Sequence, residues 1–263
     1  MPTMPLLRCL LLLALAGPAF AADETGGDPF KSFQWPDLRR EFLPPGARVV
    51  FDERVQVRVP AFAEDPMNVP VTVSAAGLDE VEQITVIVDR NPIRKVLEYF
   101  PVQALASLSF RFKLEQASPV RAAVRTRDGT WHVGGALVDS AGGGCTVAGS
   151  TRADGSWTTT LGRVSGRLFP ASGAAPQASR LRVLVMHPMD TGLANGIPAF
   201  YVNKFSLRDE QGRELLRMNT FEPVSENPVF SFDFAVKPAG ALRLVGTDNN
   251  GNRIDGRIDG RVE

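Results

Sequence analysis

One cysteine stands out in the sequence as a residue that could do chemistry. Cys145 follows three consecutive glycines, Gly142, Gly143 and Gly144, and the other cysteine of the 263-residue chain is Cys9. Glycine lacks a Cβ and reaches backbone conformations that other residues avoid, so this run suits a flexible stalk. A thiol on such a stalk could be handed into the pocket of another protein, or it could be an idle cysteine in a linker. The residues alone leave both interpretations open.

The first 21 residues have the pattern of a secretory signal. Arg8 supplies a positive charge, residues 10–16 form a short apolar run, and Ala19-Phe20-Ala21 fits the small-residue cleavage rule. That run is too short to span a bilayer, and no later segment of the sequence is long enough. We therefore expect a signal peptide over residues 1–21, cleavage near Ala21 or Ala22, and export to a bacterial periplasm. Cys9 would be lost, and an unpaired cysteine in an exported chain indicates an intermolecular bond or a reactive thiol.

The composition excludes some classes of function. Lys plus Arg equals Asp plus Glu at 29 each, so no basic surface for nucleic acid is expected. The chain has two histidines, His132 and His187, which make a poor ligand set for a metal. We expect no metal and no resident cofactor.

Short runs of alternating apolar residues, separated by turn residues, cover most of the chain. A short helix capped by Asp37 is expected near residues 37–43. The runs predict an all-β chain of two immunoglobulin-like β-sandwich domains. The strands expected are 55–59, 69–75, 81–89, 110–114, 120–126, 131–138, 181–185, 200–207, 213–219, 229–234 and 241–245.

The expected domains are residues 22–140 and 179–263, joined by a Gly-rich arm and linker over residues 141–178. The linker is rich in Gly, Ser, Thr, Ala and Pro, which bury little apolar surface. Trp157, Val164 and Phe169 interrupt it, so part of the linker is expected to pack on a neighbour as an extra strand. The repeating tail, residues 253–260, is interpreted as a frayed terminus.

Three other features carry weaker expectations. His132 could act as a base for the thiol, but an ordinary surface or edge-strand residue is the simpler interpretation, because no third orienting group is evident. Residues 248–252 resemble the start of a calcium loop but have Arg253 where glycine is required, so we interpret them as a solvated turn. Cys145 is expected to be exposed, with a pKa near the reference value of about 8.5.

The second half contains an ordered set of four segments: His187-Pro188-Met189-Asp190-Thr191-Gly192, Gly196-Ile197-Pro198-Ala199-Phe200-Tyr201, Ser225-Glu226-Asn227-Pro228 and Asp248-Asn249-Asn250-Gly251. These four segments, called the SoxZ-like segments below, resemble SoxZ, the small β-sandwich partner of the thiosulfate-oxidation carrier. The first half ends in Gly-Gly-Gly-Cys and resembles SoxY, whose C-terminal Gly-Gly-Cys-Gly arm carries sulfur intermediates. The chain is thus similar to a fused SoxYZ-like carrier, a type that accompanies periplasmic quinoprotein alcohol dehydrogenases.

The chain departs from the SoxY pattern in two ways. Thr146 rather than glycine follows Cys145, and more than a hundred further residues follow the arm. The arm is therefore a loop held at both ends and not a free tail.

The resemblance implies a periplasmic carrier, not an enzyme, in which Cys145 holds a covalent sulfur adduct on the arm Gly142, Gly143, Gly144. Its implied partners are sulfur-oxidation proteins or a quinoprotein dehydrogenase system, and the two domains would pair within one chain. The alternative is a non-carrier binding or assembly module for a periplasmic dehydrogenase or cytochrome, with Cys145 incidental. A thiol oxidoreductase is disfavoured because no Cys-x-x-Cys is present.

Overall fold

The structure is a computed structural model that describes residues 25–153, 155–171 and 177–261. The predicted signal peptide and Cys9 lie outside the described residues. Within the described ranges, no helix has the length and apolar character needed to cross a membrane.

The described chain is nearly all β, as predicted. It contains the α-helix α1 (Trp35–Phe42) and the short 3₁₀ helices η1 (Ser150–Arg152) and η2 (Ser156–Thr159). The strands of the first half are β1 (Val49–Phe51), β2 (Gln56–Arg58), β3 (Phe62–Ala63), β4 (Val69–Ser74), β5 (Val81–Val88), β6 (Lys95–Phe100), β7 (Ser107–Phe112), β8 (Ser118–Thr126) and β9 (Trp131–Ser140). Those that follow are β10 (Val164–Pro170), β11 (Ser179–Val185), β12 (Val202–Arg208), β13 (Glu214–Thr220), β14 (Val229–Phe234), β15 (Leu242–Asp248) and β16 (Arg253–Ile258).

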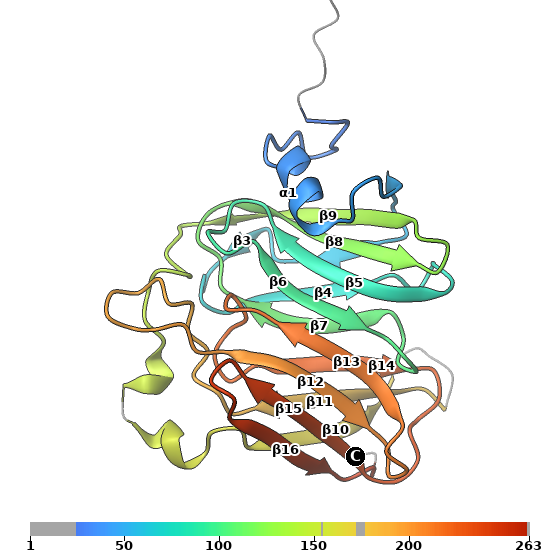
Figure 1. Ribbon diagram of the computed structural model, residues 1–263, viewed down its shortest axis with the longest axis vertical. Coiled ribbons are helices and arrows are strands. Elements are labelled where there is room, and N and C mark those ends of the chain that lie inside the picture. The colour runs from blue at the N-terminus through green and yellow to red at the C-terminus, as the bar shows by residue number, and fades with distance from the viewer. Residues whose placement is uncertain (1–24, 154, 172–176, 262–263) are drawn as a thin grey trace, which may run out of the picture.

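Two sheets run through both halves of the chain. One has the order β1-β9-β8-β5-β6-β13-β12-β15-β16, with β3 beside β9, and the other has the order β10-β11-β14-β7-β4-β2. The halves meet where β6 pairs with β13, with Met218 opposite Tyr99, and where β7 pairs with β14. Figure 1 shows the first half, blue to green, continuing through this seam into the orange and red strands of the second. The halves are therefore joined edge to edge.

The core is continuous across that seam. Alternation in β4 turns Val69, Val71 and Val73 inward, and alternation in β14 turns Phe230 and Phe232 inward, as period-two strands of a sandwich require. Tyr99 of β6 stacks on Phe232 with ring centroids 5.6 Å apart. One hydrophobic cluster consequently includes residues of both halves.

A buried ionic group fixes the N-terminal segment to the outer face of the first sheet. Arg121 of β8 bonds both oxygens of Asp28 at 2.6 and 2.7 Å and both oxygens of Asp89 at 2.7 and 2.8 Å. All three side chains are fully buried. The guanidinium also lies over the Trp35 ring at 4.6 Å. Because Trp35 belongs to α1, this one side chain connects the helix, the segment before it and the sheet.

Several expectations need correction. The tail is not frayed: β16 pairs with β15, and Ile254 and Ile258 are buried. Asp37 does not cap α1, because it lies in the first turn of a helix that begins at Trp35. The strand β6 was not among those predicted. Part of the expected linker forms β10, which pairs with β11 from Val164 to Pro170.

Replacing Arg121 by leucine should lower the free energy of unfolding by about 3–5 kcal/mol, because it leaves two buried carboxylates without a counter-charge. Urea denaturation followed by fluorescence measures the change. The matched control is Arg243→Leu, which breaks an exposed pair with Asp255 and should cost less than about 1 kcal/mol. Equal losses for the two variants would contradict the structural role assigned to Arg121.

Candidate functional site

Cys145 is docked against the protein and fully buried, so the expectation of an exposed thiol is wrong for this conformation. The chain leaves β9 at Ser140 and turns back along the residues that follow β7. There the Cys145 Sγ donates to the Lys113 carbonyl oxygen at 3.5 Å. The thiol therefore faces a backbone acceptor inside the molecule instead of solvent.

The Glu115 carboxylate holds the backbone around the thiol. Glu115 accepts the N–H of Cys145 at 2.9 Å, the N–H of Thr146 at 3.2 Å and the Thr146 hydroxyl at 3.0 Å. Just before the cysteine, Gly143 and Gly144 donate their N–H groups to the carbonyl oxygens of Glu115 and Leu114, both at 3.1 Å. Bonds to a charged acceptor are stronger than neutral ones, so Glu115 is the main anchor of the docked cysteine.

The glycine run is needed for the docking of Cys145 as well as for conformational freedom of the backbone. Gly142 and Gly143 have φ of +93° and +88°, a region that strains other residues. A Cβ on Gly144 would lie 2.2 Å from the Pro66 carbonyl oxygen and 2.5 Å from that of Leu114. Gly142 and Gly143 therefore make the turn, and Gly144 lets the backbone approach closely enough to bury Cys145.

The second half of the chain completes the site. The Thr191 hydroxyl donates to the Cys145 carbonyl oxygen at 2.5 Å, and the buried Lys113 ammonium donates to the Met189 carbonyl oxygen at 2.8 Å. The docked cysteine is thus held by Glu115 from one half and by Thr191 from the other.

The SoxZ-like segments converge behind this site. Residues 187–192 and 196–201 meet through paired backbone bonds between Asp190 and Phe200. The Asn249 side chain accepts from the Tyr201 N–H at 2.9 Å and donates to the Ala199 carbonyl at 3.0 Å. Asn227 accepts from the His187 N–H at 3.1 Å. These four segments are far apart in sequence, and together they form the scaffold that carries Thr191.

Burial sets the protonation of two groups here. Burial, and secondarily the Glu115 charge, raise the pKa of the Cys145 thiol to about 12, against an opposing effect of Lys113. The docked thiol is therefore protonated at neutral pH and is a poor nucleophile. Burial also lowers the pKa of His187 to about 4, although Asp248 lies 3.5 Å from its Nε2. His187 is therefore a neutral ring packed on Phe200, with centroids 4.3 Å apart.

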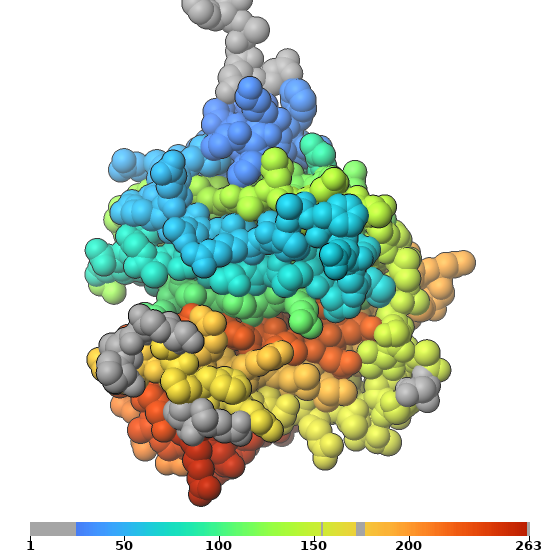
Figure 2. Space-filling view, turned by 180° about the vertical axis from the view of Figure 1, so that it is seen from behind, coloured from blue at the N-terminus to red at the C-terminus, as the bar shows by residue number. Residues whose placement is uncertain are grey.

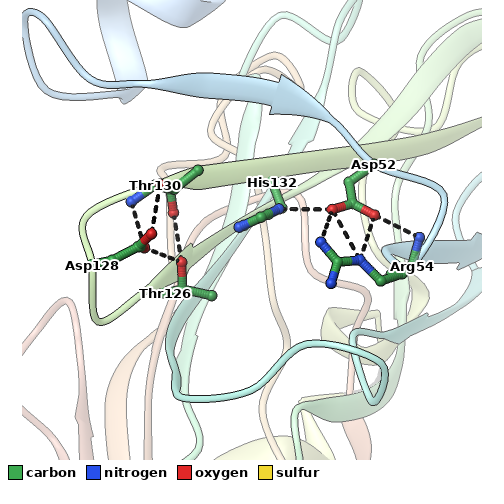
Figure 3. Close-up of polar contacts among 6 residues, drawn as sticks. All are labelled: Asp52, Arg54, Thr126, Asp128, Thr130 and His132. Atoms are coloured by element: carbon green, nitrogen blue, oxygen red, sulfur yellow. Dashed lines mark hydrogen bonds and ion pairs between the residues drawn. The ribbon is translucent and has the colours of Figure 1, made fainter.

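His132 lies in a separate polar network and does not serve the thiol (Figure 3). Its Nδ1 is 2.8 Å from Asp52 Oδ2, and Arg54 binds the same carboxylate. The Arg54 guanidinium holds the pKa of Asp52 well below its usual range. His132 pairs with Val50 of β1 on one side and Val124 of β8 on the other, so it is not on an edge strand. Among the described residues, the hydrogen-bond partners of Cys145 do not include His132.

Metal ligands do not gather in the described part of the chain: it contains no group of three or more His, Cys, Asp or Glu side chains placed to hold an ion. The turn at residues 248–252 is closed by Asp248 itself, which accepts the N–H groups of Asn250 and Asn252, both at 2.9 Å. The residues that matter most beside Cys145 are Glu115, Thr191 and Lys113. None of them was identified as a site residue from the sequence, although Thr191 lies in a SoxZ-like segment.

Glu115→Gln should increase alkylation of Cys145 by iodoacetamide near pH 8 by about 10-fold, since it weakens charge-assisted bonds to the docked backbone and removes a negative charge near the thiol. Mass spectrometry of the Cys9→Ser chain, in which Cys145 is the sole thiol, gives the rate. Glu82→Gln, which affects an exposed pair with Arg125 on β8, is the control and should react like the parent. Equal rates for all three proteins would remove Glu115 as the anchor.

His187 should make stability depend on pH. Its pKa is about 4 when folded and 6.5 as a free side chain, so only the unfolded chain gains a proton as pH falls through this interval. The stabilisation is present above pH 6.5 and is lost toward pH 4, by about 2.5 kcal/mol near pH 4.5. Urea unfolding at two pH values should show this excess loss in the parent and not in His187→Gln. A parallel loss in both proteins would assign the dependence to other groups.

Two family models match separate parts of the chain. The family model for "Sulfur oxidation protein SoxY" matches residues 39–145, and that for "Sulphur oxidation protein SoxZ" matches residues 169–259. The first match ends at Cys145, and the second includes all four segments behind the site. No curated protein sequence matches the chain significantly.

A solved structure of the sulfur carrier protein SoxY from Chlorobium limicola f thiosulfatophilum aligns with a TM-score of 0.34 and 16% identity. The alignment covers 40% of this chain and 93% of that one. The two family regions, SoxY followed by SoxZ in one polypeptide, identify the chain as a fused SoxYZ-like protein.

Proposed function

We propose that this protein is a periplasmic carrier that holds a sulfur compound covalently on Cys145 while separate enzymes act on it. Membership of a sulfur-oxidation carrier family supports this role. The observation that carries the proposal is the docking of Cys145, the last residue of the SoxY match, on Glu115 of one family region and Thr191 of the other. The arm is anchored by groups from exactly the two regions that define the family.

The docked state protects the thiol and the released state presents it. In the docked state Cys145 is covered, protonated and bonded to a backbone carbonyl, so it reacts slowly with solutes. Release breaks hydrogen bonds that water can replace, and no apolar side chain other than the thiol itself has to leave the site with Cys145. Outside the site the pKa of the thiol returns toward its ordinary value, and the thiolate becomes available.

The protein itself supplies little of the chemistry. Both histidines are occupied elsewhere: His132 bonds Asp52, and His187 is buried and neutral. On this proposal the partner enzyme provides the base and the electron acceptor. The predicted signal sequence supports a periplasmic site of action, and the resemblance to fused dehydrogenase-associated carriers supports a quinoprotein dehydrogenase system as the setting.

A second candidate is a structural module for assembly of a periplasmic dehydrogenase or cytochrome. The complete burial of Cys145 favours it, because a small buried thiol can serve simply as a packing residue. On this alternative the arm stays docked, and function resides in the outer surfaces of the sandwich.

Loading Cys145 distinguishes the two. Tetrathionate needs no added oxidant: the Cys145 thiolate attacks an inner sulfur, the central S–S bond breaks, and thiosulfate leaves with the electron pair while Cys145 keeps an –S–SO₃⁻ group. Intact-mass spectrometry of the Cys9→Ser chain should show this adduct in the parent and not after Cys145→Ser. Protein isolated from its own periplasm should carry a sulfur adduct at the same residue.

The in vivo test uses Cys145→Ser, which removes one sulfur nucleophile and keeps a small side chain. Sulfur-compound oxidation or dehydrogenase-dependent growth should be lost in this variant if Cys145 is the carrier. An unmodified Cys145 in native protein, combined with full growth of Cys145→Ser, would favour the assembly module.

A further inference from the structure

The loop that bears Cys145 is anchored on both sides at equal distances. Cys145 lies five residues after Ser140 and five residues before Ser150. Ser140 ends β9, where Asp139 and Ser140 pair with β3, and its hydroxyl accepts the Gly142 N–H at 3.0 Å. The upstream end of the loop is therefore a strand end fixed in the fold.

The downstream anchor is a second carboxylate. Glu226 accepts the N–H groups of Ser150 at 2.9 Å and Thr151 at 3.1 Å, and the Asn227 amide donates to the Thr151 hydroxyl at 3.1 Å. A Cβ on Gly149 would lie 2.1 Å from the Glu226 carboxylate, so a larger residue there would displace that carboxylate from its present position. The loop thus begins on the first half and is fixed again on the second.

The chain after the anchor is also packed. Arg152 lies over the rings of Trp157 and Phe200 at 5.6 and 5.2 Å and within 3.8 Å of Asp190. In Figure 2 the yellow-green chain in this region lies along one side of the molecule against the second half. The length of chain that can extend with Cys145 is accordingly limited to the residues between Ser140 and Ser150.

Simple geometry then limits what the loop can reach. Five fully extended residues span about 17 Å. A loop fixed at both ends must enter a partner as two chains side by side, with axes about 5 Å apart at the closest. Two exposed apolar side chains lie near Cys145. Val147 is on the loop and is 51% exposed. Leu193 is 41% exposed, and its backbone N–H donates to the hydroxyl of Thr191.

We infer that the partner of this surface is a sulfur-processing enzyme whose reacting centre lies in an open groove. The groove is at least two chains wide, no deeper than about 17 Å, and has an apolar rim that covers Val147 and Leu193. This inference rests on the proposed carrier role and specifies the shape of the partner site. A narrow tunnel that admits a single terminal chain does not fit an arm of this construction.

The reach can be measured without the natural partner. In the Cys9→Ser chain, Cys145 is labelled with biotin through maleimide spacers of graded length, and capture by streptavidin, whose biotin site is recessed, is recorded. A second protein carries a protease recognition sequence between Ala148 and Gly149 and is assayed before and after cleavage. The halves stay together after the cut because β6–β13 and β7–β14 pairing does not pass through the loop.

The shortest spacer that allows capture should be longest for the parent, shorter for the uncut insertion protein and shortest after the cut. The same spacer threshold for all three would overturn the inference, because it would show that the double anchorage does not limit reach. The readout contains no sulfur cargo, so this failure is distinct from the absence of an adduct on Cys145.

Ser150→Pro provides a variant without an insertion. It removes the N–H that Glu226 binds, and proline suits the first position of η1 because Gly149 is extended, with φ −67° and ψ 145°. Its threshold should lie below that of the parent. Capture of Ser150→Pro at the parental threshold would show that the bond from the Ser150 N–H to Glu226 does not limit the reach of the loop.

Discussion

The pairing of β6 with β13 and of β7 with β14 is the interaction on which the rest of the structure depends. It turns two sandwiches into one pair of continuous sheets with a common core. It also determines what lies next to the end of β7, because Lys113, which follows that strand, donates its N–H to Pro223 and its ammonium to Met189. Without this seam Glu115 and Thr191 would not face the same cysteine.

On the proposed carrier role, two opposing requirements meet at Cys145. A carrier thiol has to be reactive toward its enzyme and unreactive toward everything else, and a single fixed environment cannot provide both. The structure supplies the unreactive environment through burial, a backbone acceptor for the Sγ–H and a carboxylate nearby. The three glycines allow Cys145 to leave its docked position. Gly144 is also needed in the docked state, because its backbone lies close to the backbones of Pro66 and Leu114. Flexibility and close packing are thus served by the same residues.

Much of the fold followed from local pattern, and the contacts of the site did not. Alternation located most strands, and the glycine run before a single thiol located Cys145. The strand β6 has the irregular burial of a central strand, and its charged residues Lys95 and Glu98 satisfy one another at 2.9 Å, so its sequence does not alternate. Its partner β13 lies more than a hundred residues away, and nothing in the local sequence indicates that pairing.

The burial of Cys145 was missed for a similar reason. Glu115 is one acidic residue after a strand, and only the three-dimensional path of the arm brings it to the Cys145 N–H. Residues 253–260 were interpreted as a frayed terminus because glycine and charged residues dominate their repeat. In the structure Gly256 leaves room for the Val164 side chain, and Ile258 packs against Gly166. Residues whose roles depend on contacts with distant parts of the chain cannot be recognised from their neighbours in the sequence.

The covalent connection between the halves changes the thermodynamics of their seam. In two separate chains, association of these sheet edges would be bimolecular and would weaken on dilution. Here β10 continues the polypeptide into the second sandwich, so the edges meet at an effective concentration set by the intervening chain. The composite site around Cys145 consequently keeps a one-to-one stoichiometry of its two halves at any expression level, and in the folded protein the β6 and β7 edges are paired and not exposed.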